Sequence, residues 1–118
     1  MTRIVFIAGP YRAPTPWEIE SNIRRAETVA LEVARLGATP LCPHTMYRFF
    51  QDALPDAFWL ASTKALLSRS DGLLVIPRWQ DSPGSRMEYA HAAGLGLPVW
   101  EWPHDYEDLR AWISNSLA

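Results

Sequence analysis

The sequence predicts a single α/β domain in which a parallel β-sheet is covered by helices on both faces. Its 118 residues are 48% hydrophobic and 20% charged, which suits one compact domain with a buried core. Short apolar segments alternate along the chain with longer segments of helical periodicity. Because parallel strands need crossover connections, this alternation is typical of an α/β/α layered sheet. Neither a repeat nor a linker divides the sequence, so we expect residues 1–118 to form one domain.

The first strand and the first helix have the clearest signals. Residues 4–8 are apolar on both faces, as in a buried parallel strand, and a glycine-proline pair ends the run. Thr15 is the predicted N-cap of a helix, with Pro16 at its first position. Gly37 is expected to end that helix in a left-handed conformation. The apolar positions between them recur every three or four residues: Ile19, Ile23, Ala26, Ala30, Val33 and Leu36.

The rest of the chain continues the alternation of strand and helix. The predicted elements are, in order, a strand (38–42), an irregular loop with at most one helical turn (44–55), a helix capped by Asp56 (56–69), a strand (71–76), a loop (77–83), a helix (84–93), a strand (98–102) and a last helix capped by Asp105. In such sheets, ligands bind beyond the carboxyl ends of the strands. The candidate site is therefore expected on three loops, at 9–14, 43–56 and 78–84.

Composition narrows the possible functions. One cysteine excludes an internal disulfide framework and a cysteine-rich zinc site, and the three histidines lack metal-ligand spacing. A net charge of −2 argues against a broad nucleic-acid surface. The apolar runs are too short to span a bilayer, and the first residues lack a signal-peptide pattern. We expect a cytoplasmic protein without a metal, a nucleic-acid partner or a membrane partner.

The first candidate loop carries a glycine and an arginine suited to a ligand. Gly9 lets the backbone approach a bound molecule closely. The planar guanidinium of Arg12 is suited to a phosphate or a carboxylate. A plain strand-to-helix turn with a solvated Arg12 explains the same residues, and both interpretations remain open.

The third candidate loop is richer in chemistry. Ser82, Gly84 and Ser85 lie where a helix begins, and free backbone N–H groups with the helix dipole favour an anion there. Glu88 follows one turn later, so its carboxylate can lie beside that anion site. An alternative structural role for Glu88 is that of capping-box partner of Ser85.

Tryptophan is abundant, with six residues in the chain. Trp79 can stack on a planar base, although a place in the core or in a subunit contact explains it equally well. Six tryptophans do not fit into one small core. We therefore expect an oligomer interface that uses Trp17, Trp59 or Trp112.

An ordered set of short motifs resembles the nucleoside 2-deoxyribosyltransferase-like superfamily, in particular its small bacterial and phage members of unknown function. The set covers nearly the whole chain, as far as about Trp102. In order, the motifs are Phe6-Ile7-Ala8-Gly9-Pro10-Tyr11, Asn22, Gly37 with Pro43, Ser70-Asp71, Trp79 with Ser82-x-Gly84-x-x-x-Glu88, and Gly96-x-Pro98-Val99.

The resemblance implies a flavodoxin-like, doubly wound parallel sheet of four to five strands and a homodimer or higher homo-oligomer. It also implies cofactor-free chemistry at the N-glycosidic bond of a nucleoside or nucleotide. Glu88 matches the family nucleophile. Three residues match positions that hold a 5′-phosphate in the nucleotide-hydrolysing branch, and Arg12 favours a nucleoside 5′-monophosphate: Arg12, Ser82 and Gly84. The complete predicted substrate-binding set is Gly9, Tyr11, Arg12, Trp79, Ser82, Gly84 and Ser85.

Two positions depart from the family pattern. Phe6 stands where family enzymes usually carry a tyrosine hydroxyl near the nucleophile. Thr63 stands where they carry an aspartate that engages the base or sugar. Tyr11 and Asp81 are the residues that could substitute for these groups in space.

The predicted mechanism is a retaining displacement by an ionised Glu88, in which Asp81 assists departure of the base. We expect Glu88 to be ionised at neutral pH because the helix N-terminus and Arg12 or Arg86 oppose its desolvation. Two alternatives remain: a non-catalytic nucleotide-binding module that acts as a sensor or regulator, and a structural oligomer with a vestigial pocket.

Overall fold

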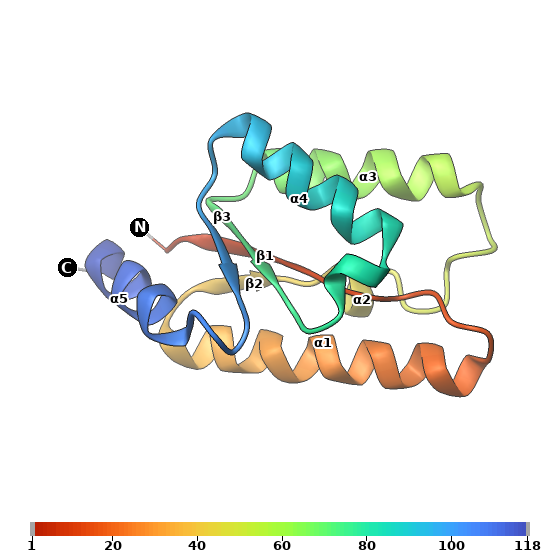
Figure 1. The fold of residues 1–118 in the computed structure, drawn as a ribbon, viewed down its shortest axis with the longest axis horizontal. Helices are drawn as coiled ribbons and strands as arrows, with labels where there is room; N and C mark the ends of the chain where they lie inside the picture. The colour runs from red at the N-terminus through yellow and green to blue at the C-terminus, as the bar shows by residue number, and fades with distance from the viewer. Residues whose placement is uncertain (1, 118) are drawn as a thin grey trace.

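The computed structural model describes residues 2–117 as a parallel sheet between two layers of helices (Figure 1). The strands lie in the order β2-β1-β3-β4, and each neighbouring pair is parallel. This is the strand order of doubly wound, flavodoxin-like sheets, so the predicted fold class is confirmed. The strand bounds are β1 Ile4–Ala8, β2 Thr39–Leu41, β3 Gly72–Val75 and β4 Val99–Glu101.

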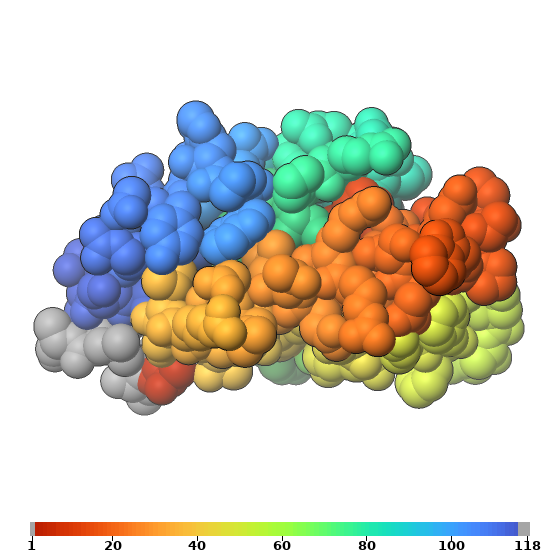
Figure 2. All heavy atoms as spheres, turned by 90° about the horizontal axis from the view of Figure 1, so that it is seen from below, coloured from red at the N-terminus to blue at the C-terminus, as the bar shows by residue number. Residues whose placement is uncertain are grey.

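The helices divide between the two faces of the sheet. Helices α1 and α5 pack on one face, while α3 and α4 pack together on the other (Figure 1). Seen from below, α1 runs across the exposed face of its layer, with α5 near one end (Figure 2). The helical bounds are α1 Pro16–Leu36, α2 Pro43–Met46, α3 Asp56–Ser68, α4 Pro83–Leu95 and α5 Tyr106–Leu117, with a short 3₁₀ helix, η1, at Trp79–Asp81. Among the described residues, no helix combines the length and apolar character needed to cross a membrane.

Alternate residues of β1 build two separate cores. Val5 and Ile7 face the α1 and α5 layer, whereas Phe6 and Ala8 face the α3 and α4 layer. All four are buried. Because side chains alternate along a strand, a run that is apolar at every position covers both faces of the sheet.

The predicted caps of α1 are confirmed. The Thr15 hydroxyl accepts a hydrogen bond from the Glu18 backbone N–H at 3.2 Å, and Gly37 ends the helix with φ 103°. The predicted cap of α3 is wrong: Pro55 occupies the N-cap position, and Asp56 lies in the first turn. The side chain of Asp56 pairs instead with Arg12. Asp105, the predicted cap of the last helix, lies directly before α5, and its side chain accepts a hydrogen bond from the Glu101 backbone N–H at 2.8 Å.

Helix α4 begins one residue earlier than predicted. Ser82 is its N-cap, and the Ser82 hydroxyl accepts from the Ser85 backbone N–H at 3.2 Å. Pro83 therefore occupies the first helical position, which suits a residue without an N–H. This arrangement places Glu88 beyond the capping-box position, so the capping role considered for it is not the one observed.

Candidate functional site

A cavity of about 1080 Å³ opens at the carboxyl edge of β1 and β3. The strand order reverses between these two strands, which is where open α/β sheets bind ligands. All three loops predicted to carry the site contribute to its wall. The volume lies at the upper end of the range for small-molecule sites, so it can hold a ligand of nucleotide size.

The structure brings most of the predicted site residues to this cavity. Those that line it are Gly9, Tyr11, Arg12, Asp81, Ser82, Gly84, Ser85 and Glu88. Gly9 is required by packing, because a Cβ there would lie 2.2 Å from Cγ1 of Ile76. The ends of β1 and β3 therefore approach one another more closely than any side chain at position 9 allows.

Trp79 lies elsewhere. Its ring stacks on Tyr89 with centroids 4.6 Å apart, and its Nε1–H donates to the Glu101 carboxylate at 3.1 Å. It borders a smaller hollow of about 260 Å³ and packs against the α3 and α4 core. The structure thus places Trp79 in a packing role and does not bring it to the wall of the large cavity.

Glu88 is partly buried in the cavity wall, and its ionisation is strongly perturbed. Burial raises the pKa of Glu88 to about 7, against a smaller lowering by a hydrogen bond from Thr63. The sequence predicts that the ionised form of Glu88 prevails at neutral pH, whereas a pKa of about 7 leaves a large share of the molecules protonated there. The arginines that were predicted to lower the pKa of Glu88 have other partners: Arg12 pairs with Asp56, and Arg86 donates to the Gln80 carbonyl at 2.6 Å.

The two residues that differ from the deoxyribosyltransferase-like motif pattern, Thr63 and Phe6, have different places in the structure. Thr63, on α3, lines the cavity and is the hydrogen-bond partner of Glu88. Phe6 is fully buried in the core. The Tyr11 hydroxyl is already engaged, since it donates to the Gln51 side chain and accepts from the Phe49 backbone N–H, both at 2.7 Å. Tyr11 therefore braces the loop instead of replacing the absent hydroxyl beside Glu88.

The rim of the cavity carries two exposed ion pairs. Arg12 pairs with Asp56, and Arg78 Nε lies 3.2 Å from Asp81 Oδ2. Exposed pairs of this kind contribute little to stability and open easily. A charged ligand can therefore compete for either arginine.

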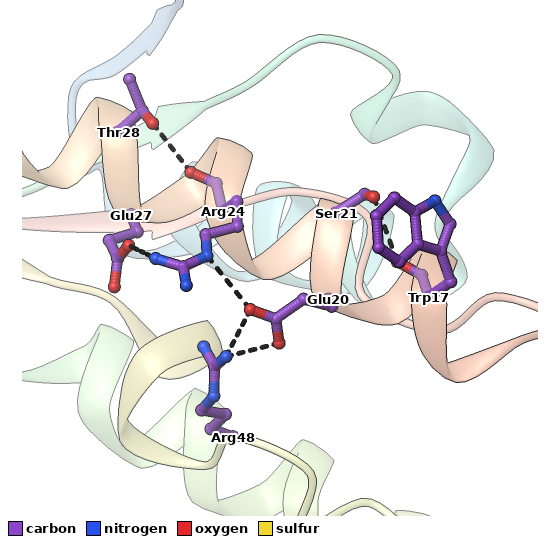
Figure 3. Close-up of polar contacts among 7 residues, drawn as sticks. All are labelled: Trp17, Glu20, Ser21, Arg24, Glu27, Thr28 and Arg48. Atoms are coloured by element: carbon purple, nitrogen blue, oxygen red, sulfur yellow. Dashed lines mark hydrogen bonds and ion pairs between the residues drawn. The ribbon is translucent and has the colours of Figure 1, made fainter.

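The loop after α2 is tied to α1 by a charged network (Figure 3). Glu20, on α1, receives hydrogen bonds from Arg48 in the loop and from Arg24 on its own helix. Arg24 also contacts Glu27 at 3.1 Å. Because Tyr47 and Gln51 of this loop line the cavity, the network helps to hold one of its walls in place.

Three buried polar atoms without hydrogen-bond partners in the described chain belong to residues that line the cavity. They are His44 Nδ1, Trp59 Nε1 and Ser85 Oγ. Leaving such an atom unpaired costs about 1–3 kcal/mol, and because less than 1 Å² of each atom is open to solvent, none of the three faces the open cavity directly. Ser85 was among the predicted residues. His44 and Trp59 were not, although His44 lies in a loop predicted to carry the site.

Metal-binding side chains do not gather here: within the described residues, no three of them form a group able to hold an ion. Residues 3–102 match a family model described as Domain of unknown function (DUF7768). No curated protein matches the chain.

Proposed function

Because the chain belongs to this family of unknown function (DUF7768), we propose an activity from its site: cleavage of the N-glycosidic bond of a nucleoside or nucleoside 5′-monophosphate, with Glu88 as nucleophile. The observation that supports this most directly is the desolvated carboxylate of Glu88 in a cavity of nucleotide size. Perturbed ionisation in a cleft is typical of catalytic carboxylates. The ordered motifs that resemble the deoxyribosyltransferase-like superfamily provide separate support.

The start of α4 supports an anionic group in the ligand. Pro83 has no N–H, and the Ser85 N–H is taken by the Ser82 hydroxyl oxygen, so the Gly84 N–H is the early helical donor left to a ligand. The Ser82 hydroxyl keeps its own proton to donate. A phosphate at this position would also gain from the helix dipole.

In the proposed reaction, a Glu88 carboxylate oxygen forms a bond to the anomeric carbon while the bond from that carbon to the base nitrogen breaks. The base leaves with the bonding electrons and takes up a proton. Water, or a second base, then displaces the glycosyl ester and restores the carboxylate. Because only the ionised carboxylate is nucleophilic, the rate is expected to rise with pH through about 7. Asp81 is the second carboxylate proposed to assist the leaving base, once its pair with Arg78 opens.

A non-catalytic nucleotide-binding module is the second candidate. It is favoured by the burial of Phe6 and by the neutral Thr63 beside Glu88. With these residues the site lacks the tyrosine and the aspartate that deoxyribosyltransferase-like enzymes usually carry. The same cavity would bind a nucleotide without breaking it.

Incubation with a panel of nucleosides and their 5′-monophosphates tests the proposal, with free base measured by chromatography. We expect base release by the native protein and its loss, by at least about 100-fold, in Glu88→Gln. Glu18→Gln is the matched control, because Glu18 is an exposed carboxylate in the same cavity wall. Thermal stabilisation by a nucleotide without any free base would support the binding module and contradict the enzyme.

A further inference from the structure

We propose that the substrates of this site are N-glycosides whose base carries a positive charge, such as an N-alkylated purine or a pyridinium. This inference rests on the proposed function, because it names the substrate class for cleavage at Glu88. A neutral base must receive a proton when the bond from the anomeric carbon to its nitrogen breaks. A cationic base takes up the bonding electrons and leaves as a neutral molecule, with no proton transferred. The two classes therefore differ in whether the cavity must supply an acid.

The carboxyl groups that line the cavity do not supply this proton. Glu88 is the proposed nucleophile and cannot act as the acid in the same step. Asp56 and Asp81 are exposed, and each is paired with an arginine, which stabilises the carboxylate form. Glu18 is exposed in the first turn of α1, where the helix dipole also favours the carboxylate. These side chains can accept a hydrogen bond from a base but hold no proton for it.

The histidine and the tyrosines of the cavity are already engaged in hydrogen bonds. Nε2 of His44 lies 2.9 Å from the Pro10 carbonyl oxygen, which can only accept, so Nε2 carries the ring proton. Burial lowers the pKa of His44, so the ring is neutral at neutral pH and this proton is its only one. Burial raises the pKa of Tyr11, and the Tyr47 hydroxyl lies 2.7 Å from Ser62 Oγ. Arginines keep their protons, so among the described residues that line the cavity no acid is left for a neutral base.

The walls of the cavity suit a cationic ring. Four carboxyl groups and three guanidinium groups line it: those of Glu18, Asp56, Asp81 and Glu88, and those of Arg12, Arg25 and Arg78. Trp17, in the first turn of α1, also lines the cavity and is 80% exposed, so its ring is open to a ligand. Figure 3 shows this ring clear of the charged network around Glu20. The face of an indole ring attracts a cation, which a neutral base does not offer.

Two matched pairs of probes test this substrate class, because the members of each pair differ in the charge of the base. The first pair is 7-methylguanosine 5′-monophosphate and guanosine 5′-monophosphate at pH 6. The second is nicotinamide mononucleotide and its reduced form, whose ring is uncharged, at pH 8. Cationic N-glycosides also break faster in water, so each turnover rate is divided by the rate in buffer without protein.

This ratio of rates distinguishes the two kinds of site. A general acid helps only the neutral member of a pair, so it would raise the ratio of that member about 100-fold or more above the ratio of its partner. We expect instead that, in at least one pair, the ratio for the cationic member is at least as large as that for the neutral one. Release of base from the cationic member alone is the limiting case of this result.

Asp81→Asn examines the carboxyl group that lies on the loop before α4. If Asp81 supplied a proton, this variant would slow the cleavage of guanosine 5′-monophosphate and leave that of its methylated partner unchanged. We expect any change in rate to be the same for both members. Asp56→Asn is the matched control, since Asp56 is also an exposed carboxylate of the cavity wall that is paired with an arginine.

The pH dependence with nicotinamide mononucleotide gives a readout that packing alone does not change. The rate is expected to rise through about pH 7 as Glu88 ionises and then to stay level, because no acid has to retain its proton. A fall in the rate at higher pH would reveal a required acid and contradict the inference.

The outcomes separate this inference from the proposed function. A larger ratio for the neutral member in both pairs, or a loss confined to the neutral probe in Asp81→Asn, overturns the inference and leaves an N-glycosidase in place. Failure of all four probes to release base faster than in buffer overturns both. Release of base from a cationic probe that persists in Glu88→Gln also overturns both, because Glu88 would then not be the nucleophile.

Discussion

Glu88 lies in an environment that opposes the negative charge its proposed chemistry needs. Among the cavity's carboxylates, Asp56 and Asp81 are more than 60% exposed and paired with arginines. Glu88 is instead partly buried, with the neutral Thr63 as its hydrogen-bond partner. A carboxylate kept in such a place at a cost to stability is typical of a functional group.

This cost predicts a pH-dependent effect of Glu88→Gln on stability. The pKa of Glu88 is about 7 in the folded protein and 4.5 for an ordinary glutamate, so the unfolded chain releases this proton first as the pH rises. The free energy of unfolding of the native protein therefore falls between about pH 4.5 and 7, by at most about 3.4 kcal/mol. Glutamine does not titrate, so the free energy of unfolding of the variant does not fall in this way as the pH rises.

Chemical denaturation at pH 5 and pH 8 measures the effect. We expect Glu88→Gln to be more stable than the native protein at pH 8, with a much smaller difference at pH 5. Glu18→Gln, at an exposed site, should show no such change with pH. A variant that is equally stable at both pH values would mean that Glu88 is not desolvated as described.

At the scale of elements, the sequence predicted what short-range chemistry determines. The caps of α1 at Thr15 and Gly37 follow from local hydrogen bonding and backbone conformation, and both were predicted correctly. Asp56 was misassigned as a cap because its partner, Arg12, is 44 residues away in the chain. Contacts across such distances depend on how the sheet brings loops together, which local patterns do not encode.

The close approach of β1 to β3 gives a second prediction. In Gly9→Ala, the new methyl group would meet the Ile76 side chain, so we expect a loss of about 1–3 kcal/mol from overpacking and a disturbed cavity. Gly84→Ala is the matched variant, since its Cβ would find its nearest neighbour at 3.7 Å. It should fold at least as stably as the native protein. Thermal unfolding of the two variants checks this, and equal stability would contradict the packing described.

For the whole molecule, the fold class, the edge of the sheet that carries the cavity and most of the named residues that line it were predictable from the sequence. The sequence could not predict that His44 Nδ1 and Trp59 Nε1 are buried without a hydrogen-bond partner among the described residues, because this is a property of the folded chain alone. Trp79 was predicted at the cavity because it shares a loop with Ser82, yet its ring packs on Tyr89. Loop membership does not determine the direction of a side chain.

The oligomer stays a prediction, and the three candidate tryptophans differ in their availability. Trp17 is 80% exposed, whereas Trp59 lies in an aromatic cluster and Trp112 packs on Trp100 beneath Arg3. Of the three, Trp17 is thus the one most available for an interface. It also lines the large cavity, so a contact there would lie at the site.

The proposed bond between the Glu88 carboxylate and the sugar is open to direct detection by intact-mass spectrometry of the protein quenched during turnover of a nucleoside 5′-monophosphate. We expect an added mass of one sugar phosphate, located on the peptide that contains Glu88 and absent from Glu88→Gln. Rapid release of base by a Glu88→Gln protein, or an adduct on another residue, would contradict it.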